Sequence, residues 1–173
     1  MAWGKAGSTT LASTGDTIAI DSLSNNKYSI VLINATSTGG GADSSIRFNS
    51  DSGSNYARRV SSNGGSDSTN TSDNRYQMAA YTNRDSFSVN YFCNISSEEK
   101  LGISHQIDQQ SAGAGTAPTR YEIVGKWVNT SDAVSEIDIV NVNAGSFATG
   151  SNVSVIGSDM TPAAAIPLSL IHI

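Results

Sequence analysis

The sequence has few of the residue types that mark a catalytic or metal-binding protein. Its 173 residues include one cysteine, two histidines and three prolines, and charged residues make up only 14%. One cysteine excludes an intrachain disulfide, and together with two histidines it is too little for a zinc site of the usual spacing. Outside residues 168–173 the one histidine is His105, which leaves little to build a serine-hydrolase set of nucleophile, base and orienting acid, and no G-x-S-x-G motif occurs. We therefore expect a protein that is not an enzyme and needs no cofactor.

Long apolar runs are also absent. No window approaches the roughly 18 apolar residues of a membrane-spanning helix, and the N-terminus M-A-W-G-K-A-G-S lacks the apolar core of a signal peptide. The formal net charge is −5, which argues against a nucleic-acid partner because phosphates require a basic face. We expect a soluble chain made in the cytoplasm, with neither membrane nor nucleic acid as a partner.

Serine, threonine, asparagine and glycine take the place of the missing charges, as is typical of short strands separated by polar turns. The alternation of apolar and polar residues predicts roughly nine to eleven strands in an all-β, antiparallel jelly roll or β-sandwich. The run Tyr28–Asn34 is the most apolar of the early ones and predicts a central strand buried on both faces. The other predicted strands are Ser8–Ser13, Asp16–Asp21, Ile46–Phe48, Tyr56–Arg59, Arg75–Tyr81, Ser86–Cys93, Leu101–Ile107, Arg120–Val128, Glu136–Asn141 and Asn152–Gly157.

The length suits a single domain, which we place at residues 1–159. Residues 160–167 read as a linker or tail. The last six residues, L-S-L-I-H-I at 168–173, can be encoded by CTG-TCT-CTT-ATA-CAC-ATC, which matches the end of a transposase-based sequencing adapter. We expect this hexapeptide to be a read-through product, so that the natural C-terminus lies elsewhere.

The stretch Ile46–Arg59 predicts a β-hairpin, because two strand-like runs flank a loop of Asn, Ser, Asp and Gly. Alternating Asn49, Asp51 and Asn55 resemble half of an oxygen-ligand loop for calcium. Only one of these is a carboxylate, so a plain turn rich in Asn and Asp is the other interpretation. Two polar segments, 61–74 and 109–119, predict exposed loops that face solvent or a partner.

Aromatic and basic residues supply the candidate contacts for a glycan or a protein partner. Tyr56, Tyr76 and Trp127 could form platforms for sugar rings, although each is equally suited to a core. Arg58 and Arg59 lead into the longest polar segment and complete this candidate set.

Cys93 and His105 are predicted to be core residues. Cys93 is in phase with Phe87, Val89 and Tyr91, and His105 shares the apolar face of a predicted strand with Leu101, Ile103 and Ile107. Catalysis by His105 or by a pair of carboxylates remains a minor alternative.

Several motifs occur together in a distinctive order. R-F-N-S-D-S-G-S-N-Y at 47–56 and N-G-G-S-D-S-T at 63–69 are followed by E-E-K-L-G-I at 98–103 and A-G-A-G-T-A-P at 112–118. E-I-V-G-K-W-V-N-T-S at 122–131 and G-S-N-V-S-V-I-G-S-D at 150–159 complete the set. Over residues 1 to 159 the chain resembles a family of small virion structural proteins encoded by tailed phages in marine and other environmental DNA.

The resemblance implies a capsid-decoration, head-fibre or tail-associated protein located in the virion. It implies no catalytic residues. The expected partners are other virion proteins and further copies of the chain, because virion parts repeat around symmetry axes. The alternative function is a carbohydrate-binding, lectin-like receptor-binding domain that recognises a glycan on the host surface.

Overall fold

The computed structural model describes residues 3–78, 84–109 and 111–160, and this part of the chain forms eleven strands and no helix. The strands are β1 (Trp3–Thr10), β2 (Thr17–Ile20), β3 (Asn26–Ala35), β4 (Ser45–Phe48), β5 (Tyr56–Ser62), β6 (Ser68–Asp73), β7 (Ser86–Cys93), β8 (Lys100–Asp108), β9 (Thr119–Trp127), β10 (Ile137–Val140) and β11 (Asn152–Met160). The prediction of an all-β antiparallel sandwich is therefore confirmed.

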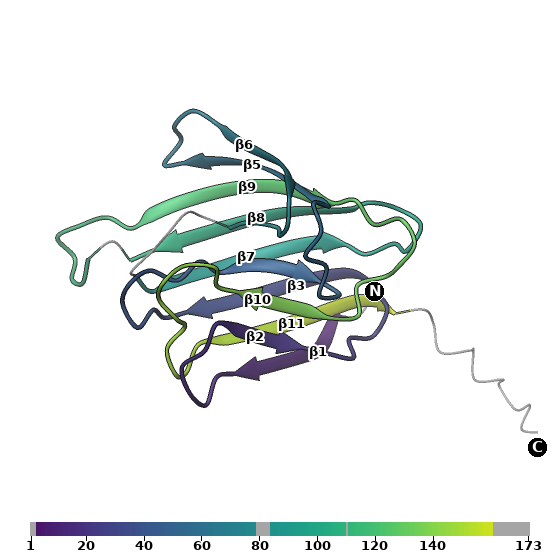
Figure 1. Ribbon diagram of the computed structural model, residues 1–173, viewed down its shortest axis with the longest axis horizontal. Coiled ribbons are helices and arrows are strands. Elements are labelled where there is room, and N and C mark those ends of the chain that lie inside the picture. Colours follow the sequence, from purple (N-terminus) through teal and green to yellow (C-terminus); the bar gives the residue numbers. More distant parts are fainter. Residues whose placement is uncertain (1–2, 79–83, 110, 161–173) are drawn as a thin grey trace, which may run out of the picture.

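The two sheets are unequal in size. Eight strands form one antiparallel sheet in the order β1-β11-β3-β7-β8-β9-β5-β6, and three form a second sheet in the order β2-β10-β4. In Figure 1 the large sheet runs from β6 at one edge to β1 at the other, and β2 and β10 lie across its lower half. We call the face of the large sheet that meets the small sheet the inner face, and the opposite face the outer face.

The core lies between the small sheet and the inner face. Ile18, Ile46 and Ile139 of the small sheet are fully buried and belong to the same hydrophobic cluster as Val31 and Val153 of the large sheet. Aromatic rings fill the middle of this layer: Phe48 packs edge-on against Phe92 at 4.8 Å between ring centroids and at 5.6 Å from Trp127. Rigid rings packed in this way contribute strongly to stability.

The remainder of the inner face is polar. The inward positions of β7 and β8 include Ser88, Asn90, Ser104 and Gln106, each at most 3% exposed. Several of their polar atoms are hydrogen-bonded: the Asn90 amide donates to the Val31 carbonyl, and the Ser104 and Tyr76 hydroxyls lie 3.1 Å apart, whereas the Asn90 side-chain oxygen has no partner among the described residues. Buried polar groups are tolerated when they are paired in this way.

The predicted hairpin at Ile46–Arg59 is wrong. β4 pairs with β10 in the small sheet, whereas β5 pairs with β6 and β9 in the large sheet. The intervening loop therefore crosses from one layer to the other, and the Tyr56 hydroxyl accepts a hydrogen bond from the Phe48 backbone N–H beneath it. Positive φ angles at Asn49 and Ser50 turn the chain out of β4.

Other sequence predictions differ from the structure in detail. The polar segment 61–74 is exposed as expected over most of its length, but it contains β6 and is not a loop. Residues 75–78 form no strand beyond an isolated bridge between Tyr76 and Ile46. Strand β3 is buried on its inner side only, because Tyr28, Ile30 and Leu32 are half-buried on the outer face. The predicted tail at 160–167 begins too early by one residue, because Met160 ends β11; residues 161–167 and the hexapeptide 168–173 lie outside the described residues.

Candidate functional site

The outer face of the large sheet carries most of the exposed apolar surface of the described chain. Because side chains alternate across a strand, the outward residues of neighbouring strands form continuous rows. One row joins Tyr91 of β7, Ile103 of β8 and Val124 of β9, which are partners in register. A second row joins Phe87 to Ile107.

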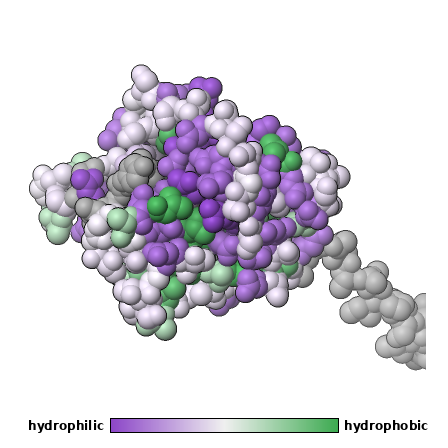
Figure 2. Space-filling model, in the orientation of Figure 1, coloured by the Kyte–Doolittle hydropathy of each residue, from purple (hydrophilic) through white to green (hydrophobic). Residues whose placement is uncertain are grey.

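These side chains are about half exposed. Seven large apolar residues on this face keep between 42% and 58% of their surface accessible, namely Trp3, Phe87, Tyr91, Leu101, Ile103, Ile107 and Val124. In the view of Figure 2 the surface is mostly hydrophilic, with apolar residues only in small separate groups. Isolated exposed apolar residues are ordinary, whereas a continuous patch of this kind marks an interaction surface.

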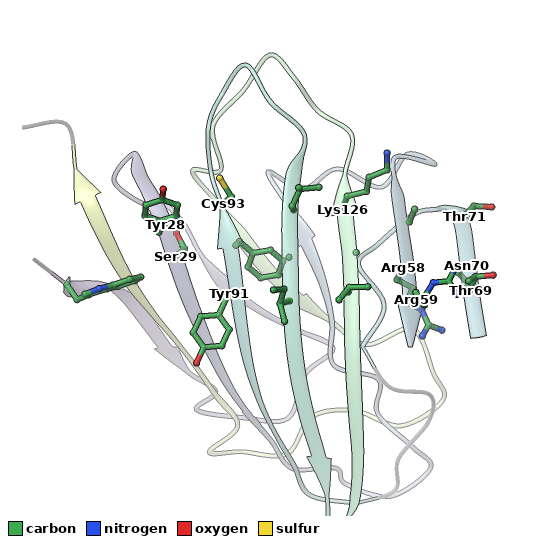
Figure 3. A pocket seen from close by; sticks show the side chains of 18 residues that line it. Tyr28, Ser29, Arg58, Arg59, Thr69, Asn70, Thr71, Tyr91, Cys93 and Lys126 are labelled. Carbon is green, nitrogen blue, oxygen red and sulfur yellow. The ribbon is translucent and has the colours of Figure 1, made fainter. Parts of the chain in front are cut away.

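A groove of about 850 Å³ crosses the outer face. Its lining residues come from seven of the eight strands, from Trp3 on β1 to Thr71 on β6. Tyr28 and Tyr91 lie on one side, and Arg58, Arg59 and Asn70 lie on the other (Figure 3). Leu101, Ile103 and Val124 lie between the two sides. The groove therefore combines an aliphatic floor with one aromatic wall and one polar wall.

The charges around the groove are paired within the chain. Arg59 lies 3.1 Å from Asp67, Lys126 lies 2.7 Å from Glu99, and Arg120 lies 3.8 Å from Glu122. The three pairs are solvent-exposed and contribute little to stability. They do offset one another in charge, so this face carries no strong field of one sign.

Arg58 and Arg59, which the sequence predicts as contact residues, both line this groove. The Arg58 guanidinium donates a hydrogen bond to the Gln77 side-chain oxygen at 2.8 Å, and burial lowers the pKa of Arg58. Arg59 is exposed and makes the ion pair with Asp67. The two arginines are thus held in place by neighbours on either side of β6, Asp67 before it and Gln77 after it.

The three aromatic residues predicted as contacts lie inside the protein, and that prediction is wrong. Tyr56, Tyr76 and Trp127 are each 1% exposed. Burial raises the pKa of Tyr76 to about 12, and burial also raises the pKa of Tyr56. The rings belong to the aromatic core, so no glycan or protein can stack on them.

The calcium candidates do not converge on a common point. The Asn49 side chain bridges two neighbouring segments: its amide donates to the Ala133 carbonyl, and its oxygen accepts from the Ser135 N–H. Asp51 instead accepts hydrogen bonds from the Trp127 indole at 2.6 Å and from the Asn55 amide at 2.9 Å. Burial alone would raise the pKa of Asp51, but these bonds hold it below its usual value. The loop is therefore a hydrogen-bonded support for Trp127.

The prediction that His105 and Cys93 are core residues is wrong for His105. Its side chain is exposed on the outer face, where its register partner on β9 is Glu122. Cys93 is half-buried and lines the groove. The predicted phase of both strands is correct, but the face that contains these residues points outward.

The most exposed groove residues, Leu101, Ile103, Val124, Tyr91 and Trp3, were not predicted as a site. Their alternation is visible in the sequence, where it indicates a core-facing side. A partial signal of the opposite arrangement lies in the intervening positions of β8, where Gly102, Ser104 and Gln106 are small or uncharged, and only the two ends of the strand, Lys100 and Asp108, are charged. Solvent-facing positions usually include charged residues.

Two further properties concern the described residues only. They contain no group of three or more His, Cys, Asp or Glu side chains able to hold a metal ion. They also include no helix long and apolar enough to cross a membrane. With this geometry established, comparison finds no family model, no curated protein and no solved structure that matches the chain.

Proposed function

We propose that this chain is a structural protein of a phage particle, acting as a capsid-decoration, head-fibre or tail-associated component through contacts with other proteins. The observation that carries the proposal is the uncovered apolar outer face. Seven half-exposed large apolar side chains on one sheet exceed what a free monomer normally presents, and proteins use such patches for association. The sequence motifs support the virion part of the proposal, and no reaction is assigned to the chain.

The chemistry of the face favours a protein partner. Its floor consists of Leu, Ile and Val side chains, and two of its cations, Arg59 and Lys126, are already paired with Asp67 and Glu99. Apolar surface of this kind is stabilised by exclusion of water and not by hydrogen bonds. The centre of a protein–protein interface has the same composition, with aromatic and aliphatic residues at the middle and charges at the rim.

The test is assembly with the products of neighbouring genes. The chain would be co-expressed with the capsid, portal and tail proteins encoded beside it, and particles would be isolated on a density gradient. We expect the chain to sediment with particles in a fixed ratio, and Val124→Asp to lower that ratio at least fivefold because it places a charge on the face. A chain that stays at the top of the gradient, or neighbouring genes with no virion products, would refute the proposal.

A carbohydrate-binding function is the second candidate, and one observation favours it. Trp3 and Tyr91 are each 47% exposed beside the groove, and Asn70 and Arg59 provide polar groups on the opposite wall. Aromatic rings of this kind suit the apolar faces of sugars. A glycan array with the wild-type chain, and with Tyr91→Ala as the control, tests this function; signal that persists in the variant would exclude this site.

A further inference from the structure

We infer that the outer face is covered by a second copy of this chain, packed sheet against sheet in a symmetric dimer. This inference rests on the proposed function, since it names the first partner in the assembly. Its starting point is the reversed alternation of β8. Leu101 and Ile103 point outward at 58% and 55% exposure, while Ser104 and Gln106 are buried. When one face of a sheet packs on its own chain and the other faces water, the apolar residues normally point inward and the polar residues outward.

The size of the patch suits a dimer. If a large apolar side chain presents about 200 Å² when fully accessible, seven that are half exposed present on the order of 700 Å². A stable protein–protein interface buries about 800 Å² on each partner. The apolar residues and their polar rim therefore supply the area that one such interface needs.

The shape of the patch favours a second sheet over a narrower ligand. The groove crosses the sheet from β1 at one edge to β6 at the other, and it lies towards one end of the strands. Phe87 and Ile107 continue the apolar surface towards the other end, outside the groove. From Phe87 to Cys93 the patch is about 20 Å long, and across the strands it is about 30 Å wide. A helix about 10 Å in diameter would leave much of this surface in water, whereas another eight-stranded sheet can cover it.

The charges around the patch are compatible with self-association. The ion pairs Arg59–Asp67 and Lys126–Glu99 place both signs at the rim of the same face. Two copies related by a two-fold axis present the same residues to each other, so a face of one sign would repel itself. The outer face carries both signs and therefore does not repel a second copy of itself, although the whole chain has a formal net charge of −5. A strongly charged partner would find no complementary field here.

Two valines of nearly equal exposure provide a matched test. Val124 lies on the outer face and is 48% exposed, whereas Val142 follows β10 of the small sheet and is 46% exposed. Sedimentation velocity of the full chain from about 1 to 100 µM should show a dimer of about 36 kDa, twice the 18.0 kDa monomer. Val124→Asp should raise the dimer dissociation constant at least about 100-fold, because it would bury an unpaired carboxylate. Val142→Asp should leave it unchanged.

Far-UV circular dichroism checks that each variant is folded. Ile103→Ser is a milder change on the outer face and should raise the dimer dissociation constant about tenfold. The inference is overturned if the wild-type chain is monomeric at 100 µM, or if Val142→Asp weakens association as much as Val124→Asp does.

A monomeric chain that still enters particles would mean that another virion protein covers the face, which leaves the proposed function intact. A dimer that never enters particles would refute the proposed function alone. The inference of a dimer is also overturned if the wild-type chain is monomeric and its signal on the glycan array is lost in Tyr91→Ala.

Discussion

The inner and outer faces of β7 and β8 show that alternation and burial are separate properties of a strand. On the inner face Ser88, Asn90 and Ser104 are almost completely buried, and on the outer face Tyr91 and Ile103 are about half exposed. The Asn90 amide and the Ser104 hydroxyl are paired with backbone and side-chain partners there. Alternation thus identifies which residues share a face, but the rest of the fold decides which face its own chain covers.

The reversal is confined to the centre of the large sheet. On β3 and β11 the inward residues Val31, Ile33, Val153 and Val155 are apolar and at most 1% exposed. These strands lie opposite the small sheet, so their inner face needs apolar contacts. The inner face therefore divides into an apolar half that holds the sandwich together and a polar half. The predictions below test this division and its contrast with the outer face.

The largest effect is expected in the aromatic layer of the core. Trp127→Ala removes a ring that contacts Phe48 and stacks at 6.3 Å from Tyr56, and it leaves a cavity that neighbouring strands cannot close. We expect a loss of about 3–5 kcal/mol in the free energy of unfolding, measured by urea denaturation followed by circular dichroism. Val124→Ala, three residues earlier on the outer face of β9, should cost less than about 1 kcal/mol. Equal losses would contradict the assignment of faces.

A second comparison uses adjacent residues of β8. A methyl group added at Gly102 would overlap the Phe92 ring, which is fixed edge-on between Phe48 and Tyr76. Gly102→Ala should therefore reduce the free energy of unfolding by about 1–3 kcal/mol through overpacking. Leu101→Ala, on the outer face, should change it by less than about 0.5 kcal/mol in a monomeric sample. A tolerated Gly102→Ala would mean that the ring is free to move.

Much of the fold could be predicted from the sequence. Period-two alternation located most of the strands, since it depends only on local backbone geometry. The connection between β4 and β5 was wrong because turn residues such as Asn49 and Gly53 favour any reversal of the chain, and they do not distinguish a hairpin from a crossing between layers. That choice depends on which distant strands pair, here β10 with β4 and β9 with β5.

The candidate site was harder to predict. Large aromatic residues such as Trp127 suit a core and a ligand platform equally well, and their environment is set by packing between distant strands. Arg58 and Arg59 do line the groove, but their predicted contact with a glycan or a protein stays a prediction. The apolar outer row containing Ile103 looked like core, since the alternation along a strand is the same whether its apolar side faces inward or outward.

The Asp51–Trp127 contact allows a test at the edge of the aromatic layer. Asp51→Asn removes the charge from the hydrogen bond to the indole and should cost about 1–2 kcal/mol at pH 7. Because the pKa of Asp51 is lowered in the folded state, its contribution is present above its ordinary pKa of about 4 and disappears as the pH falls through the folded value. Urea unfolding of both proteins between pH 7 and pH 2 should therefore show the difference shrinking in acid. A constant difference would contradict this account.

The smallest effect concerns Asp108, a fully buried carboxyl group in the polar half of the inner face. Burial raises its pKa, although hydrogen bonds from Gln106 and Tyr121 oppose the shift. A raised pKa destabilises the fold at pH 7, and the wild-type protein regains that stability as the pH falls through the folded pKa towards about 4.

Asp108→Asn keeps an acceptor for Gln106 without the buried charge, so it should add up to about 1 kcal/mol at pH 7 and nothing near pH 4, as measured by urea unfolding. Asp67→Asn, which breaks an exposed ion pair beside the outer face, is the control and should change stability by less than about 0.5 kcal/mol. A less stable Asp108→Asn at pH 7 would show that the charge is compensated within the inner face. The polar half of the inner face would then be stabilised by ionic contacts as well as by hydrogen bonds. It would differ from the apolar half in charge and not in hydrogen bonding alone.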